Sequence, residues 1–260
     1  MPIQFVGIPF DVNSSFLRGP ALAPDVIRST FFNGASNFCT EDGSDLGVPG
    51  ILIDSGNITV SRYAEIEPLI KKILPDGKLI SLGGDHSISY PVINAHNKEY
   101  GPFDVLHIDA HADLYDSYED NPWSHACPFA RILGDGLIKR LVQVGIRTLN
   151  QHQREQAAKY NVEIIEMKAI GSFKNLSFNN PVYISVDLDA VDPAFAPGVS
   201  HHEPGGLTTR ELLAIIQSIH ARVIGADIVE FNPLRDHQNI TGALAAKILK
   251  EIAAKMLSNG

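Results

Sequence analysis

Cysteine, tryptophan and positive charge are all scarce in this chain of 260 residues. It has 2 cysteines, 1 tryptophan, and 21 Lys and Arg residues against 30 Asp and Glu, for a formal net charge of −9. Two cysteines far apart in the sequence, Cys39 and Cys127, do not make the disulfide framework of a small secreted protein. The negative charge and the lack of any basic run argue against nucleic acid or an anionic membrane as a partner.

The chain also lacks long apolar runs. No stretch approaches about 18 apolar residues, so no membrane span is expected. The first residues carry no charged segment before an apolar one and look like a first strand, not a signal peptide. With so little cysteine, these features predict a cytoplasmic location. Cys127 lies two positions from His125, so it is either a small packed residue or a reactive thiol.

What the chain does contain is a regular alternation of short apolar runs and helical patterns. An apolar fraction of 44% is ordinary for a globular protein of this length. Alternating β and α elements with continuous apolar strands predict an α/β fold whose parallel sheet has helices on both faces. No linker or repeat interrupts the pattern, so one domain is expected over residues 1–260. The expected strands are 3–8, 51–53, 79–82, 104–108, 141–145, 162–166, 182–187 and 223–230, and the expected helices are 24–31, 61–74, 88–99, 125–133, 150–159, 208–220 and 241–257.

Five residues that bind metal ions well form two short clusters, each directly after an apolar run. Asp109, His111 and Asp113 alternate with alanine, and Asp187 and Asp189 flank one leucine. Residues two apart in extended chain point to the same side, so each cluster can aim at one point. Four carboxylates in one low-dielectric pocket would repel one another unless cations were present. Hard divalent cations suit carboxylate and imidazole ligands, so the sequence predicts a metal centre, with two ions favoured.

Two further polar segments follow other expected strands. His86 lies in a Gly-Gly-Asp-His-Ser turn after the strand at 79–82, and Glu230 closes the strand at 223–230. In open α/β sheets the ligand crevice lies outside the carboxyl ends of the strands. Alone, His86 would be a turn residue and the Asp187–Asp189 pair would suit a loop cap equally well. Four such segments at strand ends predict one shared site.

The other histidines have different expected places. His107 lies within a strand and is expected to be packed or to contact a ligand residue. Four more are expected to be surface or cap residues: His96, His152, His220 and His237.

Three segments resemble the signatures of the ureohydrolase family, which includes the arginases and agmatinases. They are Gly83-Gly-Asp-His-Ser87, Asp109-Ala-His-Ala-Asp113 and Ser185-Val-Asp-Leu-Asp-Ala-Val-Asp-Pro-Ala-Phe-Ala-Pro-Gly198. The resemblance covers nearly the whole chain. It is strongest to plant-type arginases, which share the style of Asn13-Ser-Ser-Phe-Leu-Arg-Gly-Pro20 and Val229-Glu-Phe-Asn-Pro233.

The resemblance implies a three-layer α/β/α sandwich with a central, mostly parallel eight-stranded sheet, in agreement with the eight expected strands. It also implies two Mn²⁺ ions per subunit, although Ni²⁺, Co²⁺ and iron suit the same ligands. Members of the family are usually trimers or hexamers, so a homo-oligomer is expected. By motif position, His86 and Asp113 would hold one ion, His111 and Asp189 the other, and Asp109 and Asp187 would bridge both.

The reaction implied by the resemblance is hydrolysis of the guanidino group of arginine to urea and ornithine. A hydroxide bridging the two ions would attack the guanidinium carbon, because metal ions lower the pKa of bound water. Asp113 or His125 would protonate the leaving amine, and His125 matches a family proton shuttle or substrate contact. Glu230 matches the glutamate that accepts hydrogen bonds from the planar guanidinium. His125 also suits a helix start, and Glu230 a structural ion pair.

The residues expected at the substrate tail depart from those of animal-type arginases. An acidic residue that contacts the substrate amino group falls near Asn150, and a family threonine falls at His201. Asn150 and His201 therefore join His125 and Glu230 as candidate substrate contacts, while His201 and His202 suit either a carboxylate anchor or loop packing.

Arginine is the favoured substrate, and agmatine, guanidinobutyrate and guanidine are alternatives ahead of formimidoylglutamate. A binuclear phosphatase is a competing class, but only Arg18 and Arg147 come near the motifs to hold a phosphate. A non-catalytic relative is a third class, and the complete set of six ligand residues argues against it.

Overall fold

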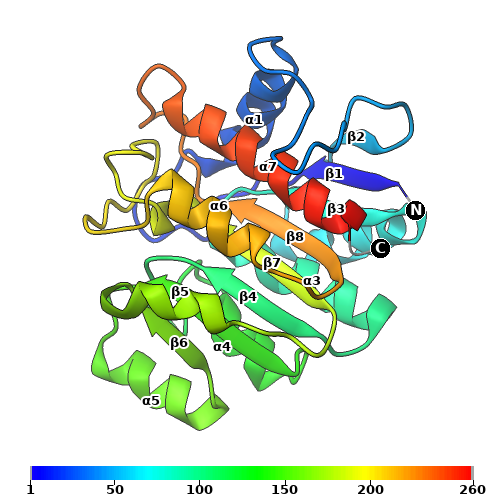
Figure 1. Cartoon of the computed structure of the whole chain (residues 1–260). Helices are drawn as coiled ribbons and strands as arrows, with labels where there is room; N and C mark the ends of the chain where they lie inside the picture. Colours follow the sequence, from blue (N-terminus) through cyan, green and yellow to red (C-terminus); the bar gives the residue numbers. More distant parts are fainter. Residues whose placement is uncertain (1, 259–260) are drawn as a thin grey trace.

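The computed structural model describes residues 2–258, apart from the side chains of residues 172, 174 and 175. In this part of the chain eight strands form one sheet in the order β2-β1-β3-β8-β7-β4-β5-β6, and all neighbouring pairs are parallel. Helices cover both faces of the sheet (Figure 1), which confirms the expected three-layer α/β/α fold. The strands are β1 Ile3–Gly7, β2 Leu52–Asn57, β3 Lys78–Leu82, β4 Asp104–Ile108, β5 Arg140–Ile146, β6 Glu163–Glu166, β7 Val182–Asp187 and β8 Val223–Val229.

The inner strands are mostly apolar because both of their faces are covered. Every residue of β3, β4, β7 and β8 is buried. The two edge strands differ: β2 exposes most of its residues, and β6 carries a glutamate at each end. Polar edges of this kind keep a sheet from pairing with other chains.

Two groups of helices make the outer layers. On one face α1, α6 and α7 pack together, and on the other α2 packs on α3 and α3 on α4. The helices are α1 Ala23–Phe32, α2 Ile66–Ile73, α3 Ser89–Tyr100, α4 Pro128–Gly134, α5 Gln151–Tyr160, α6 Thr209–Gln217 and α7 Ile240–Ser258, with short 3-10 segments η1 Pro20–Leu22, η2 Tyr63–Glu65, η3 Leu74–Asp76, η4 His86–Ile88, η5 Met167–Asn175 and η6 Leu188–Ala190.

Most helix boundaries lie within three residues of those expected. The exception is the helix expected at 61–74, of which only residues 66–73 are α-helical, between η2 and η3. The capping box at α6 is present: Thr208 Oγ1 accepts the backbone N–H of Glu211 at 3.2 Å, and the Glu211 carboxylate accepts the backbone N–H of Thr208 at 2.8 Å.

The expectation that His96 is a surface or cap residue is wrong. Its side chain is 0% exposed, because it lies on the face of α3 that packs against the sheet. Its Nδ1 lies 2.8 Å from the carbonyl oxygen of Val92, and its ring meets the ring of Tyr183 edge-on. A Cβ at Gly225 of β8 would lie 2.3 Å from His96 Nε2, so glycine makes room for the imidazole.

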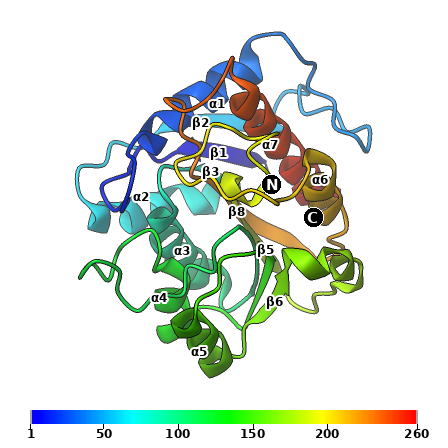
Figure 2. The same cartoon turned by 90° about the vertical axis from the view of Figure 1, so that its left-hand side faces the viewer.

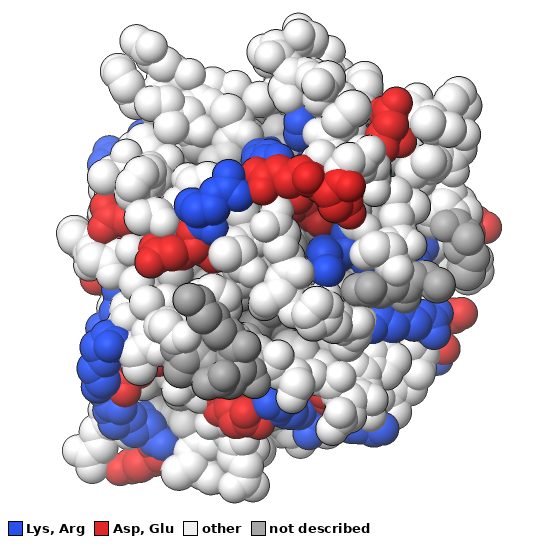
Figure 3. Space-filling model, viewed as in Figure 1, with Lys and Arg blue, Asp and Glu red and all other residues white. Residues whose placement is uncertain are grey.

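Charged side chains of both signs lie side by side on the face seen in Figure 3. In the ion pairs around α6 and α7, Glu41 lies 2.7 Å from Arg210 and 3.5 Å from Lys247, which in turn lies 2.6 Å from Glu251. These pairs tie the long connection between α1 and β2 to α6 and α7. No helix within residues 2–258 combines the length and the apolar character that a bilayer crossing needs.

Candidate active site

The polar segments singled out in the sequence follow four strands that are neighbours in the centre of the sheet, β3, β8, β7 and β4. His86 follows β3, Glu230 follows β8, Asp187 ends β7 and Asp109 follows β4. Because these strands are parallel, their carboxyl ends share one edge, where the connecting loops gather (Figure 2). The structure therefore brings the four segments together.

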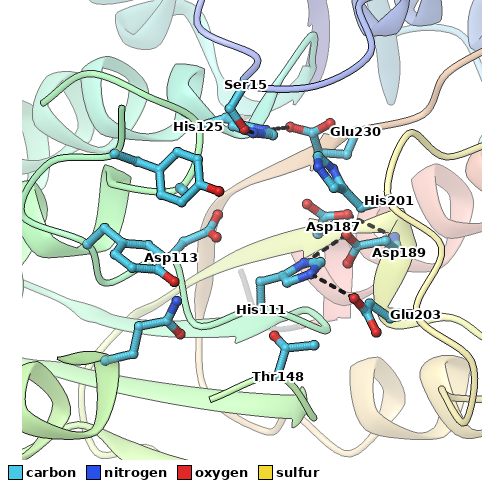
Figure 4. A pocket seen from close by; sticks show the side chains of 14 residues that line it. Ser15, His111, Asp113, His125, Thr148, Asp187, Asp189, His201, Glu203 and Glu230 are labelled. Atoms are coloured by element: carbon cyan, nitrogen blue, oxygen red, sulfur yellow. Dashed lines mark hydrogen bonds and ion pairs between the residues drawn. The ribbon is translucent and has the colours of Figure 1, made fainter. Parts of the chain in front are cut away.

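A cavity of about 220 Å³ opens at this edge of the sheet. Its walls carry five carboxylates and no lysine or arginine among the described residues that line it, so the cavity favours a cationic ligand. Figure 4 shows the side chains around it. The lining residues are Ser15, His111, Asp113, Tyr115, Tyr118, His125, Ala126, Thr148, Gln153, Asp187, Asp189, His201, Glu203 and Glu230.

One ring nitrogen of His86 faces three carboxylates. Its Nδ1 lies 3.2 Å from Asp109 Oδ2 and 3.1 Å from both Asp113 Oδ2 and Asp187 Oδ2. This nitrogen is buried and has no hydrogen-bond partner within the described part of the chain. Burial alone would lower the pKa of His86, but the three carboxylates raise it well above its usual value. The position between the nitrogen and the carboxylates therefore favours a cation, either a proton or a metal ion.

The other ring nitrogen of His86 shows where its proton lies. Nε2 is 3.0 Å from Ser185 Oγ, and the Ser185 hydroxyl donates its own proton to Asp227 Oδ1 at 2.6 Å. Ser185 is therefore the acceptor for His86 Nε2–H, and in the neutral ring the lone pair of Nδ1 points at the carboxylates. This is the tautomer that a metal-binding histidine requires, with its second nitrogen held by a fixed partner.

His111 faces the other half of the cluster. Its Nδ1 lies 3.0 Å from Asp189 Oδ2 and 3.6 Å from Asp109 Oδ1. Asp109 thus presents one oxygen towards His86 and the other towards His111. A carboxylate placed between two imidazoles in this way is suited to lie between two ions.

Two of the four clustered carboxylates disfavour their charged form. Burial, together with Asp189 and Asp109, raises the pKa of Asp187 well above its usual value, and burial also raises the pKa of Asp189. Such groups favour the neutral form unless a cation offsets their charge. Two divalent ions would offset the four carboxylates, and imidazole and carboxylate ligands suit divalent transition metals. The residues present therefore fit a binuclear metal centre.

A second hydrogen-bonded group lies across the cavity from His111 and links Ser15, His125 and Glu230 (Figure 4). His125 Nδ1 lies 2.7 Å from Glu230 Oε1, and its Nε2 lies 2.8 Å from Ser15 Oγ. Burial alone would lower the pKa of His125, but the Glu230 carboxylate raises it to about 9. Burial would likewise raise the pKa of Glu230, yet its contacts with His125 lower it. The pair therefore favours an imidazolium beside a carboxylate.

Hydrogen bonds with Asp85 and His125 hold the segment that carries Ser15. Asp85 Oδ2 accepts the backbone N–H of Asn13 at 3.0 Å and the Ser14 hydroxyl at 3.3 Å. The backbone N–H of His125 also donates to the carbonyl oxygen of Asn13, at 3.2 Å. Sequence reasoning did not assign a role to Ser15, and the only signal was its place in the Asn13–Pro20 segment of the family resemblance.

Backbone strain and a close approach also occur at this site. Asp113 and Glu230 have φ of 51° and 62°, a region that residues other than glycine seldom adopt. Strain of this kind persists at functional sites because the surrounding contacts impose it. Gly84 has no room for a side chain, since a Cβ there would lie 1.7 Å from the carbonyl oxygen of Phe10.

The structure does not bring Asn150 into the described lining of the cavity. Its Oδ1 accepts the backbone N–H of Gln153 and so caps α5, while its Nδ2 donates to Tyr115 Oη at 2.6 Å. Thr148 and Gln153, from the same stretch of chain, line the cavity instead. A helix cap with a side-chain amide explains Asn150 without a substrate.

His201 and His202 separate in the structure. His201 lines the cavity, with its ring centroid 5.3 Å from that of His125 and 5.8 Å from that of His111. His202 is exposed, and its ring nitrogen lies 2.8 Å from the carbonyl oxygen of Pro197. Of the two readings of Cys127, packing fits better, because burial raises the pKa of its thiol to about 12.

A parallel sheet with clustered carboxylates and imidazoles at its carboxyl edge defines an α/β protein with a candidate metal site of the kind that metal-dependent hydrolases use. Comparison with known proteins makes this assignment specific. Residues 1–254 match the Arginase family, and the chain belongs to that family. This confirms the ureohydrolase resemblance and makes the chain a hydrolase of C–N bonds in linear amidines.

Three relatives illustrate the family. The chain is 45% identical to "Arginase 1, mitochondrial" of Arabidopsis thaliana, over 97% of this chain and 80% of that protein. It superposes on the solved arginase of Medicago truncatula with a TM-score of 0.94 at 41% identity, over 98% of this chain and 87% of that one. It is 34% identical to "Guanidino acid hydrolase, mitochondrial" of Homo sapiens, over 95% of this chain and 76% of that protein.

The expectation of a cytoplasmic location is wrong by this comparison. Four plant relatives at 41% to 45% identity are named mitochondrial or chloroplastic, not cytoplasmic. The expectation failed because scarce cysteine indicates a reducing environment without saying which compartment supplies it.

Proposed function

We propose that this protein is an arginase, which hydrolyses L-arginine to urea and ornithine with two bound Mn²⁺ ions. The observation that carries the proposal is the unpartnered Nδ1 of His86, which faces three carboxylates in the same cavity as the Glu230–His125 pair. The likeness to arginases of Arabidopsis thaliana and Medicago truncatula supports arginine as the substrate. A single catalytic domain over residues 1–260 and a trimer or hexamer, both inferred from the sequence, belong to the same proposal.

The six ligand residues implied by the family resemblance would hold the ions. His86 and Asp113 would bind one, His111 and Asp189 the other, and Asp109 and Asp187 both. When bound, the ions lower the pKa of a water molecule and so supply a hydroxide nucleophile near neutral pH.

Glu230 would bind and orient the guanidinium group. Its carboxylate is 4% exposed, lines the cavity and stays ionised because its pKa is lowered. A planar guanidinium presents parallel N–H groups that match the two oxygens of a carboxylate. The backbone N–H of His86 donates to Glu230 Oε1 at 2.8 Å and helps to fix the carboxylate before the substrate arrives.

His125 would supply the proton that the leaving amine needs. Glu230 on Nδ1 and Ser15 on Nε2 hold its ring in one orientation, and the carboxylate favours its protonated form. Asp113 is the weaker candidate for the proton donor, because its Oδ2 faces the unpartnered Nδ1 of His86, where the proposed metal ion would bind. A positioned general acid of this kind contributes roughly 100-fold or more to the rate.

One observation keeps agmatine as a second candidate substrate. The carboxylate of arginine would meet no lysine or arginine among the described lining residues, and His201, Tyr118 or Gln153 would have to hold it. Glu203, which also lines the cavity, suits an amino group. Agmatine has a guanidinium group and an amino group, as arginine does, but it lacks the carboxylate.

A substrate panel tests the proposal. Protein loaded with Mn²⁺ is incubated separately with arginine, agmatine, guanidinobutyrate, guanidine, formimidoylglutamate and a generic phosphate ester, and the release of urea, formamide or phosphate is measured. The highest kcat/KM is expected for arginine. A higher value for agmatine would reassign the substrate within the family, and hydrolysis of phosphate esters without urea release would refute the reaction class.

Replacing a bridging ligand tests the metal centre. Asp109→Asn is expected to lower both Mn²⁺ content and urea release by more than about 100-fold, because losing a ligand outweighs losing an outer partner. Asp76→Asn is the matched control, since Asp76 is exposed in η3 at the other end of β3. Wild-type turnover in Asp109→Asn would contradict the proposed ligand set.

A further inference from the structure

Two buried residues behind Asp109 have no part in the chemistry proposed above. His107 in β4 and Gln143 in β5 are both 0% exposed, and they face each other as register partners in neighbouring parallel strands. His107 Nε2 lies 2.7 Å from Asp109 Oδ2. Gln143 Nε2 lies 2.9 Å from His107 Nδ1 and 2.6 Å from the carbonyl oxygen of Ala112. The four residues form one chain of contacts that ends on the carboxylate between His86 and His111.

The carbonyl of Ala112 decides which way the Gln143 amide points. A backbone carbonyl can only accept, so the atom of Gln143 that faces it must be the NH₂ group. The reverse orientation would place two acceptor oxygens 2.6 Å apart. Gln143 Oε1 is left buried without a hydrogen-bond partner in the described structure, which is the cost of this orientation.

The Gln143 amide in turn decides the tautomer of His107. The second proton of its NH₂ group points at His107 Nδ1, so Nδ1 is the acceptor and carries no proton. The neutral ring then has its proton on Nε2, which donates to Asp109 Oδ2. The backbone carbonyl of Ala112 can only accept a hydrogen bond, so it fixes the orientation of the Gln143 amide, and that amide fixes the tautomer of His107.

His107 is therefore not a metal ligand, although its Nε2 lies in a group with atoms of His86 and Asp109 that are all within 4.8 Å of one another. Both of its ring nitrogens are already engaged. Phe129 covers one face of the imidazole, with ring centroids 3.9 Å apart and planes at 27°. The ring of Phe129 is itself fully buried, and hydrogen bonds in such dry surroundings are stronger than those exposed to water.

We propose that Gln143 and His107 are positioning residues that hold the Asp109 carboxylate ready for two metal ions and thereby set the affinity of the protein for those ions. The inference rests on the metal centre of the proposed function. The bond from His107 fixes Oδ2, and the backbone N–H of His111 fixes Oδ1 at 2.6 Å. A carboxylate fixed at both oxygens loses little rotational freedom when the ions bind, so its ordering costs little at that step.

The test is a Mn²⁺ titration of metal-free protein, with free Mn²⁺ followed by its electron paramagnetic resonance signal. Two variants at His107 separate shape from hydrogen bonding. His107→Phe keeps an aromatic ring against Phe129 but has no donor, and it is expected to weaken Mn²⁺ binding by about tenfold or more. His107→Gln puts an amide N–H at about the position of Nε2 and is expected to retain most of the affinity. Wild-type affinity in His107→Phe, or equal losses in both variants, would overturn the inference.

A third variant keeps the histidine and removes only its partner. Gln143→Met is expected to lose affinity by less than His107→Phe, because the imidazole remains but its tautomer is no longer fixed. Gln156→Met, a buried glutamine of α5 outside the cluster, is the matched control and should bind Mn²⁺ like the wild type. If circular dichroism shows that His107→Phe does not fold, the Gln143→Met variant becomes the test. Wild-type Mn²⁺ affinity in Gln143→Met would then refute the positioning role of Gln143 and His107. A wild-type protein that binds no Mn²⁺ would instead refute the metal centre itself. Tight binding by the wild type and the variants alike would refute only the positioning role of Gln143 and His107.

Discussion

Acid should destabilise this protein partly through His96, a histidine far from the active site. Burial lowers the pKa of His96 from 6.5 to about 4, because its ring has left water for the space between α3 and the sheet. Nδ1 donates to the Val92 carbonyl at 2.8 Å, so in the neutral ring Nε2 carries no proton. Nε2 has no partner in the described structure. Protonation would place an unpaired positive charge against Gly225 and Tyr183.

The sign and size of the effect follow from this difference in pKa. The folded pKa lies below the unfolded one, so between the two values the unfolded chain binds more protons, and stability falls as the pH falls. With a reference pKa of 6.5 and a folded value of about 4, the loss is about 2 kcal/mol at pH ~5 and reaches about 3 kcal/mol below pH ~4. Above about pH 7.5 His96 is neutral in both states and contributes no pH dependence.

A comparison with His96→Asn isolates this contribution. Asparagine keeps an amide N–H near the position of Nδ1 for the Val92 carbonyl but does not titrate. Urea unfolding of both proteins at about pH 8 and about pH 5 gives two changes in the free energy of unfolding, and the wild type should lose about 2 kcal/mol more. Titration of the acidic cluster affects both proteins alike and cancels in the difference. Equal losses in the two proteins would refute the assignment of a low pKa to His96.

Three further substitutions have expected outcomes. Glu230→Ala should lower kcat/KM for arginine, measured by urea release, by about 100-fold or more. Metal analysis of this variant should show a nearly unchanged Mn²⁺ content. Loss of the metal would make Glu230 a metal ligand instead. Ser15→Ala should lower kcat about tenfold with little change in KM, because His125 loses the partner on its Nε2. Ser15→Thr keeps the hydroxyl and should restore most of the rate. An unaltered kcat in Ser15→Ala would count against the role of the hydrogen bond between Ser15 and His125. Thr208→Ala removes the cap of α6 and should lower the free energy of unfolding by about 1 kcal/mol in urea melts, and no loss at all would mean that the capping box seen at α6 adds nothing.

Much of the fold was predictable because its inner strands are short and buried on both faces. Continuous apolar runs located the inner strands, since a parallel sheet covered on both sides tolerates them. The expected strand at 51–53 covers only the start of the exposed edge strand β2. The position of the site followed from the rule that ligands bind at the carboxyl ends of parallel strands. The sequence could not give the order of the strands, because β7 and β8 enter the sheet between β3 and β4, and nothing in their local pattern shows which neighbours they choose.

The surroundings of three residues could not be read from the local sequence pattern. His96 looked like a surface residue because its helix is rich in polar residues, but Gly225, far along the chain, leaves the space that buries it. Asn150 looked like a substrate contact by its position, yet it caps α5, and its neighbours Thr148 and Gln153 face the cavity. His107 was placed only as a packed residue or a ligand contact, because its tautomer depends on Gln143 in the next strand.

The insertion of β7 and β8 between β3 and β4 has a consequence for how the protein matures. A nascent chain that has emerged only as far as residue 181 holds His86 and Asp109 on two strands that are not neighbours, with the space of two missing strands between them. The last third of the chain must arrive before those side chains can meet. On the proposed function, ion loading is therefore a late event in biogenesis, and a chain that ends before Asp187 and Asp189 lacks two of the six proposed ligands.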